Sequence, residues 1–150
     1  MNEATVNSTI RVSGHDPIQV AQGLLRGAPC PENPRISRFL GIPYAAAPTG
    51  ALRWHPPVPA APWQGERDAS DFGPVCPQPD GGTLVMFGIR GGEEMSEDSL
   101  NLNVWTGAVD ADERRPVMVW LHGGGLRIGH GSHPMYNGVC LAERGVVVVT

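Results

Sequence analysis

The chain has 150 residues, enough for one domain of ordinary size, and 41% of them are apolar. It carries 20 glycines and 15 prolines, only 17% charged residues and a net charge of −4, which excludes both a disordered acidic chain and a collagen-like repeat. All 11 basic residues are arginine, which excludes sites that need lysine, and they form no basic stripe for nucleic acid. We therefore expect a globular, loop-rich protein with no nucleic-acid partner.

Targeting and membrane signals are weak throughout the sequence. Residues 1–16 show no charged start followed by a long apolar run, and no stretch approaches the roughly 18 apolar residues of a membrane span. Cys30, Cys76 and Cys140 lie far apart with no C-x-x-C pair, a pattern typical of neither a disulfide framework nor a zinc site. We expect a cytoplasmic protein in a reducing compartment, with no membrane partner.

The first third of the chain predicts short strands separated by loops. Loose alternation predicts strands over Thr5–Val12 and Pro17–Leu25. Three prolines within residues 28–34 predict a loop. Residues 36–44 predict a strand that ends by Pro43, because proline cannot donate to a ladder.

The middle of the chain predicts irregular structure. From Pro43 to Pro79 the sequence is rich in proline and has no helical period, so we expect packed coil anchored by the indoles of Trp54 and Trp63. Residues 80–95 contain five glycines and predict a surface loop.

The last third predicts an α/β arrangement. Strict alternation over Leu100–Trp105 predicts a strand with one wet and one buried face, and the apolar runs Val117–Leu121 and Val146–Val149 predict strands buried on both faces. Between these two runs, Val139–Arg144 predicts a short helix with Gly145 at its C′ position. Strand, glycine-rich loop, helix and strand in this order are typical of α/β proteins.

The glycine-rich loop is the motif that carries chemistry. His122 and three consecutive glycines directly follow a predicted strand, where α/β folds place their ligands and where bare backbone N–H groups can approach an anion closely. The dinucleotide fingerprint fails because position 128 is isoleucine, and a Walker loop fails because His130 stands where lysine is needed. The remaining interpretation is the HGGG-type oxyanion loop of lipases and esterases.

Five segments, the last of which contains the glycine-rich loop, carry a family resemblance. In composition, order and spacing they resemble the type-B carboxylesterases, a family that includes the cholinesterases and bacterial para-nitrobenzyl esterases; the segments are Phe39–Ala45, Pro48–Trp54, Pro62–Trp63, Ser96–Trp105 and Pro116–Gly125. The resemblance implies an α/β-hydrolase fold, of which residues 1–150 would be the N-terminal part with an incomplete central sheet. Its substrate would be a small carboxylic ester, and we expect no cofactor and no metal.

The resemblance also implies roles for single residues around the loop. Gly124 and Gly125 match the two N–H donors of the oxyanion hole, and His122 and Gly123 match residues that shape the loop. Leu126 stands where relatives commonly have phenylalanine, and we expect it to line the substrate pocket.

Four positions outside the loop are assigned in the same way. Arg53 and Glu97 match a pair that forms a buried structural salt bridge in relatives. Met86 and Phe87 are expected to line the substrate pocket, by analogy with loops near the active-site gorge.

Cysteine usage departs from the family pattern. Relatives commonly have a cysteine at the position of Ser99, bonded to one that matches Cys76. We therefore expect the Cys76 thiol to be free, which fits a reducing compartment.

Two other groups of residues are given structural interpretations. We interpret His122, His130 and His133 as loop histidines rather than a metal site, because no carboxylate or cysteine joins them in the loop. The indoles of Trp54, Trp63, Trp105 and Trp120 are expected to belong to the core rather than to a substrate site.

The catalytic triad is missing from this sequence. None of the seven serines stands in a G-x-S-x-G elbow, so we expect the 150-residue chain alone to be inactive and, with two apolar strands left uncovered, unstable as a monomer. Two functions stay open: the oxyanion-hole half of a serine esterase, or a non-catalytic binding or adhesion module of the same fold. Intact glycines favour the esterase, because a binding module needs no oxyanion hole.

Overall fold

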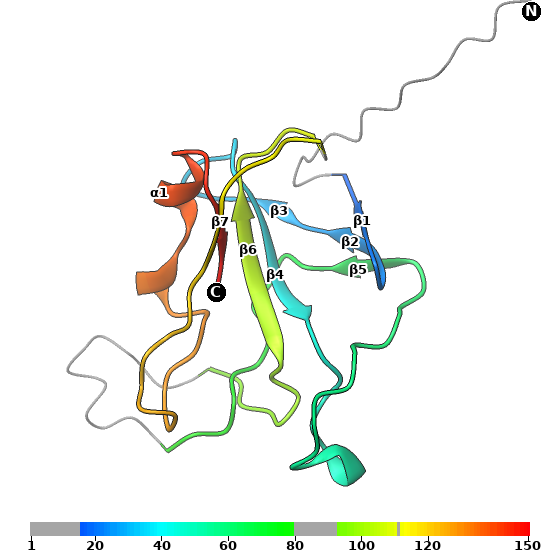
Figure 1. The fold of residues 1–150 in the computed structure, drawn as a ribbon. Coiled ribbons are helices and arrows are strands. Elements are labelled where there is room, and N and C mark those ends of the chain that lie inside the picture. Colours follow the sequence, from blue (N-terminus) through cyan, green and yellow to red (C-terminus); the bar gives the residue numbers. More distant parts are fainter. Residues whose placement is uncertain (1–15, 80–92, 111) are drawn as a thin grey trace, which may run out of the picture.

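A computed structural model describes residues 16–79, 93–110 and 112–150. These residues form a three-stranded and a five-stranded sheet with one short α-helix (Figure 1). The small sheet has the order β1 (Ile18–Val20), β2 (Gly23–Arg26), β5 (Glu66–Asp68). The larger sheet has the order β3 (Ala28–Pro29), β4 (Ser37–Pro43), β6 (Asn101–Thr106), β8 (Val147–Val149), β7 (Val117–Val119).

The N-terminal strands differ from the pattern expected. The predicted strand over residues 17–25 is wrong, because the chain reverses at Ala21 and Gln22 and forms the antiparallel hairpin of β1 and β2. The strand expected over residues 5–12 lies outside the described residues. The loop expected over 28–34 begins with the two-residue strand β3, whereas β4 ends at Pro43 as its proline predicted.

The proline-rich middle segment is only partly coil. It contains a 3-10 turn, η1 (Gly50–Leu52), and the strand β5, which pairs in parallel with β2. The expected anchoring role is confirmed for Trp63, whose indole packs with the Leu25 cluster and donates from Nε1 to the Leu24 carbonyl at 2.7 Å. It is wrong for Trp54, which is 97% exposed because no described segment packs over this turn.

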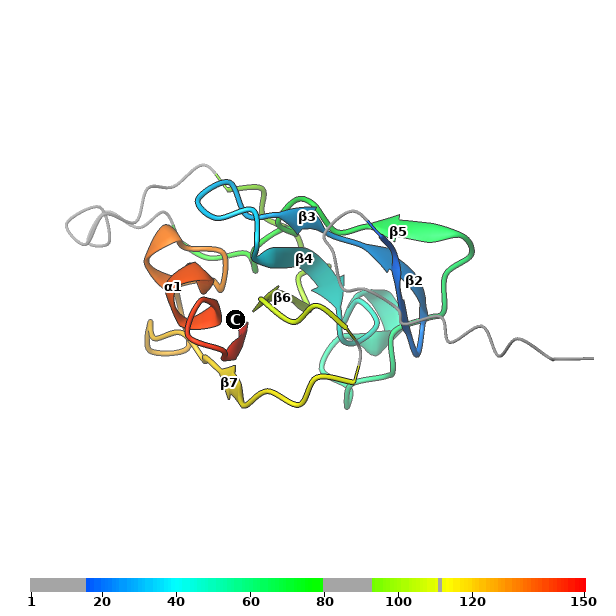
Figure 2. The same ribbon diagram turned by 90° about the horizontal axis from the view of Figure 1, so that it is seen from above.

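Two small cores lie on opposite faces of β4 and β6. On one face Leu25, Phe39 and Ala69 pack beneath the hairpin. On the other face a larger cluster packs beneath α1 (Val139–Ala142); its buried members are Cys30, Ile36, Leu40, Trp105, Val139, Ala142 and Val148. Figure 2 shows the hairpin and α1 at opposite sides of the two central strands. The expected core position of Trp105 is therefore confirmed.

The face of β6 that alternation marked as wet is buried. Asn103 is only 2% exposed, and both polar atoms of its amide have a partner: Oδ1 accepts from the Gly41 N–H at 3.0 Å and Nδ2 donates to Thr150 Oγ1 at 3.1 Å. Gly41 stands in a bulge of β4 with φ +63°, and a Cβ there would meet the backbone of Gly73 at 2.8 Å. The prediction failed because a polar side chain can be buried when every polar atom finds a partner.

The predicted helix is present but shorter than expected. It ends at Ala142, where the Val146 N–H donates to Leu141 and the Gly145 N–H donates to Ala142. This is a Schellman end with Gly145 in the left-handed region at φ +87°, as its C′ position predicted.

The edge strand β7 is the main departure from the expected burial. Val117, Met118 and Val119 are 61%, 36% and 62% exposed, whereas a strand buried on both faces was expected. β7 pairs only with β8 among the described residues, so one ladder edge and its apolar side chains are open to solvent.

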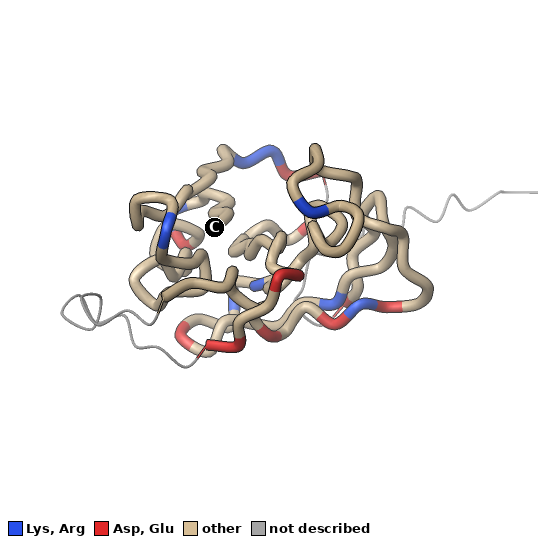
Figure 3. The backbone as a smooth tube through the Cα atoms, turned by 90° about the horizontal axis from the view of Figure 1, so that it is seen from below, with Lys and Arg blue, Asp and Glu red and all other residues tan. Residues whose placement is uncertain are grey.

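Charged residues are interspersed over the described surface. Figure 3 shows acidic and basic positions distributed over several parts of the described chain. The pair Arg26–Glu66, 2.5 Å apart, links neighbouring strands β2 and β5. No helix in the described ranges is long and apolar enough to cross a membrane.

We predict that the open edge of β7 drives self-association of the 150-residue chain. Val117→Lys should raise the fraction of soluble monomer, because a lysine on an edge strand opposes pairing with another chain. Size-exclusion chromatography with light scattering measures this fraction. Val109→Lys is the matched control, since Val109 is 60% exposed but lies outside the strand. A wild-type chain that is already monomeric with one cooperative melting transition would contradict the prediction.

Candidate functional site

The glycine loop leaves the carboxyl end of β7 and folds back on itself. Gly124 and Gly125 have φ values of +126° and +61°, and Leu126 adopts the left-handed region at +59°. The Arg127 and Ile128 N–H groups donate to the Gly124 carbonyl at 3.2 and 3.3 Å. The loop is therefore a closed turn.

Glycine is required at position 124 by close contact. A Cβ on Gly124 would lie 1.8 Å from the Ile128 carbonyl oxygen, whereas one on Gly123 or Gly125 would meet nothing within 4 Å. A side chain at position 124 would therefore open the turn.

The N–H groups of two loop glycines have no acceptor among the described residues. Within the described ranges, the N–H groups of Gly124 and Gly125 donate to no backbone or side-chain acceptor. The Gly124 backbone is half-buried and that of Gly125 is exposed. Two adjacent glycine amides without internal partners can donate to an external anion or oxyanion.

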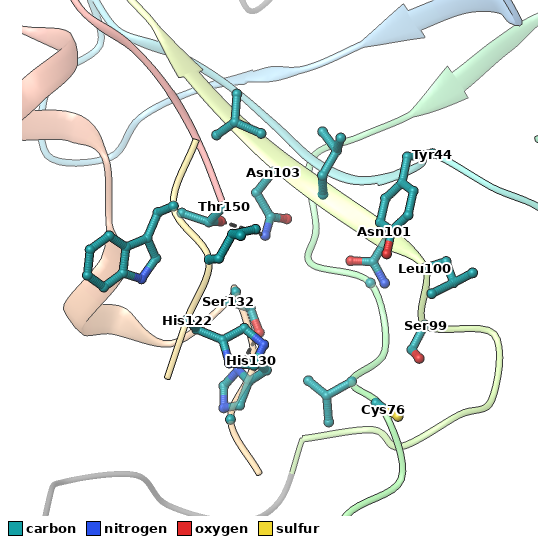
Figure 4. Close-up of a pocket in the computed structure, with 18 of the residues that line it drawn as sticks. Tyr44, Cys76, Ser99, Leu100, Asn101, Asn103, His122, His130, Ser132 and Thr150 are labelled. Carbon is teal, nitrogen blue, oxygen red and sulfur yellow. Dashed lines mark hydrogen bonds between the residues drawn. The ribbon is translucent and has the colours of Figure 1, made fainter. Parts of the chain in front are cut away.

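A cavity of about 500 Å³ lies beside this loop (Figure 4). Its walls come from β6, the ends of β7 and β8, the segment 73–76 and the loop after the glycines. Figure 4 shows Tyr44, Asn101 and Cys76 across from His122 and His130. Asn103 and Thr150, joined by their hydrogen bond, lie at one end.

The structure places two of the predicted loop residues, His122 and Leu126, at this cavity, whereas Gly123, Gly124 and Gly125 are not among the residues that line it. His122 lines it, and its Nδ1 lies 2.8 Å from the Gly123 carbonyl oxygen, so the ring is held against the loop backbone. Leu126 also lines the cavity, although its side chain is fully exposed. The core position expected for Trp120 is wrong. Its side chain is 45% exposed and borders the cavity, because β7 is an edge strand.

Two histidines behind the loop are buried. His130 and His133 are 7% and 8% exposed, with ring centroids 5.8 Å apart. Nδ1 of His130 lies 2.8 Å from Ser132 Oγ, and Nδ1 of His133 accepts from the Met135 N–H. Nε2 of each ring has no hydrogen-bond partner among the described atoms. No group of three potential metal ligands is found in the described part of the chain.

Electrostatics favour the neutral form of His130. Burial lowers the pKa of its imidazole below the ordinary value of 6.5, and the nearby His133 and His122 act in the same direction. The Glu93 carboxylate, 3.7 Å from Nε2, opposes this change.

The expected ion pair is present but not buried. Arg53 Nη2 and Glu97 Oε2 are in contact, yet the two side chains are 51% and 49% exposed. The expectation of burial is wrong because both residues stand on loops that no described segment covers. An exposed pair of this kind contributes little, typically up to about 1 kcal/mol.

The remaining sequence expectations have simpler outcomes. Cys76 is free and exposed, and it shares the cavity wall with Ser99. Met86 and Phe87 lie outside the described residues.

Two residues that shape the site were missed from the sequence. Asn103 connects β6 to Gly41 in β4 and to Thr150, and Gln78 makes two hydrogen bonds to the backbone of Gly129. Neither residue has a local signal, because their partners are 47 to 62 residues distant in sequence.

We predict that the His130 ring titrates below its value in the unfolded chain. The folded state binds fewer protons at this imidazole than the unfolded chain does. The contribution of His130 to folding stability is therefore complete above pH 6.5 and is lost as the pH falls through the pKa of the unfolded chain and then through that of the folded state. The NMR shift of the imidazole, measured in buffer and in urea, gives both midpoints. Glu93→Gln should lower the folded midpoint further, and equal midpoints in both solvents would contradict the prediction.

Comparison with known proteins gives the family. The carboxylesterase family profile matches residues 15–150. The chain is 45% identical over 115 residues to fumonisin B1 esterase of Sphingopyxis macrogoltabida, covering 77% of this chain and 21% of that protein. It is 40% identical over 115 residues to para-nitrobenzyl esterase of Bacillus subtilis, covering 76% and 23%.

Solved structures agree with the sequence comparison. A para-nitrobenzyl esterase superposes with a TM-score of 0.80 at 36% identity, over 91% of this chain and 27% of that one. A Geobacillus stearothermophilus carboxylesterase gives 0.75 at 40% identity, over 89% and 25%. The fold is thus part of an α/β-hydrolase fold, and the chain spans about a quarter of these relatives. The chain belongs to the carboxylesterase family.

Proposed function

We propose that this chain supplies the oxyanion hole of a serine carboxylesterase. The observation that carries the proposal is the pair of N–H groups on Gly124 and Gly125, which find no acceptor among the described residues. They belong to the loop whose neighbouring residues His122 and Leu126 line the cavity. The substrate class is a small carboxylic ester, whose carbonyl oxygen would accept from both amides.

The chemistry needs a nucleophile that this sequence lacks. An elbow serine attacks the ester carbonyl, a histidine takes the serine proton and delivers it to the leaving alcohol, and the carbonyl oxygen becomes an oxyanion. Gly124 and Gly125 stabilise that oxyanion with charge-assisted hydrogen bonds. Water then releases the acid by the same sequence of steps. The experiments below use a polypeptide that contains both residues 1–150 and an elbow serine. We call it the serine-bearing polypeptide.

We predict that Gly124→Ala in the serine-bearing polypeptide lowers kcat/KM for a para-nitrophenyl ester by about 10² to 10³, the usual effect of losing one oxyanion donor. The added Cβ would collide with the Ile128 carbonyl and open the turn. Gly65→Ala is the control, because Gly65 also has a positive φ of +69° but open space around it. Equal losses in both variants would contradict the proposal.

Labelling with a fluorophosphonate probe tests the class of function directly. The serine-bearing polypeptide should be labelled, and the 150-residue chain should be neither labelled nor active. An unlabelled serine-bearing polypeptide would reject the esterase and favour a non-catalytic binding module.

A further inference from the structure

Gln78 holds the far end of the glycine loop. Its Oε1 accepts from the Gly129 N–H at 2.7 Å, and its Nε2 donates to the Gly129 carbonyl at 3.2 Å. Nε2 also donates to the Cys76 carbonyl at 3.1 Å. One half-buried amide therefore pairs with both backbone groups of Gly129, as a neighbouring strand would.

Gly129 is the residue that closes the loop. It has φ +100°, and a Cβ there would lie 2.7 Å from the Gly123 carbonyl oxygen and 2.8 Å from His122 Nδ1. The backbone of Gly129 thus packs directly against the start of the loop. Movement of Gly129 toward the loop would press on Gly123, which is bonded to Gly124.

The segment that carries Gln78 is itself anchored. The Val75 N–H donates to the Glu94 carbonyl and the Ser96 N–H donates to the Val75 carbonyl, both at 2.9 Å. Asn101 Nδ2 donates to the Pro74 carbonyl, which ties the segment to β6. Residues 73–76 also form part of the cavity wall. Gln78 therefore connects the glycine loop to a fixed wall of the same cavity.

We propose that Gln78 is a positioning residue for the oxyanion loop. It holds Gly129, and through the contact of Gly129 with Gly123 it fixes where the Gly124 and Gly125 N–H groups point. The catalytic consequence of this inference rests on the proposed function. The two hydrogen bonds from Gln78 to Gly129, which we call the clamp, can be tested separately.

The clamp is tested by hydrogen exchange in the serine-bearing polypeptide. Gln78→Met keeps the length of the side chain and removes its amide, so both bonds to Gly129 are lost. Losing one hydrogen bond shifts an opening equilibrium about fivefold. Losing both bonds to Gly129 should therefore raise the amide exchange rate of a peptide spanning residues 122–130 roughly 30-fold. Mass spectrometry measures it, and unchanged exchange would overturn the clamp.

Gln19→Met provides the matched control. Gln19 Nε2 also makes two bonds to backbone carbonyls, those of Val20 and Gly23, but within the β1–β2 hairpin. This variant should leave exchange over residues 122–130 unchanged. An equal rise in both variants would mean that the effect is general loosening of the fold, and the proposal would be rejected.

The catalytic consequence is a split between kcat and KM. Gln78→Met should lower kcat for a para-nitrophenyl ester roughly tenfold or more and leave KM within about twofold, because the donors act on the oxyanion rather than on the bound ester. Raised exchange with unchanged kcat would overturn the positioning role. A wild-type polypeptide that fluorophosphonate does not label would instead refute the proposed function, while the exchange data still decide the clamp.

Gln78→Glu gives a second, isosteric variant in case Gln78→Met folds poorly. Its carboxylate can still accept from the Gly129 N–H but repels the Gly129 carbonyl, whereas the protonated acid can both accept and donate. Loop exchange relative to wild type should therefore fall as the pH is lowered from 8 to 4, through the ordinary glutamate pKa of about 4.3. A ratio that does not change with pH would contradict the two-point clamp.

Discussion

The buried amide of Asn103 is the interaction on which the arrangement of this molecule depends. It stands on β6, the strand between β4 and β8, and each side of its amide meets a different neighbour, the bulge at Gly41 and the hydroxyl of Thr150. The backbone of Asn103 also pairs with Thr150 in both directions. An unsatisfied amide here would cost about 1–3 kcal/mol, so this burial is tolerated only with the strands in this register. That register sets the wall of the cavity.

The glycine loop is built on this frame by backbone contacts. The Gly124 carbonyl accepts two hydrogen bonds from N–H groups within the turn, and Gly129 packs closely against Gly123. These contacts use carbonyl groups and glycine positions that lack a side chain. The N–H groups of Gly124 and Gly125 therefore have no partner within the described part of the chain. A preorganised pair of donors needs little rearrangement to stabilise charge that appears during a reaction.

Several exposed apolar side chains lie beside the cavity. The apolar strand β7, the indole of Trp120 and the side chain of Leu126 all stand open to solvent beside the cavity. The matched part of this chain covers only 27% and 25% of the superposed esterases. The described strands thus represent part of a sheet, and an apolar run on an edge strand is the physical sign of that.

The sequence by itself determined the features that rest on local chemistry. Pro43 ends β4 because proline cannot donate, Gly145 ends α1 because glycine adopts positive φ, and the family was recognisable from ordered motifs. Only the tertiary structure decided burial. Alternation predicted a solvent-exposed face for Asn103, and the indole in a proline-rich coil predicted a buried Trp54, but Asn103 is buried and Trp54 is exposed. Burial depends on what packs over a residue, and here those segments lie far apart in the chain. For the same reason the contact between Gln78 and Gly129, 51 residues apart, leaves no trace in the local pattern.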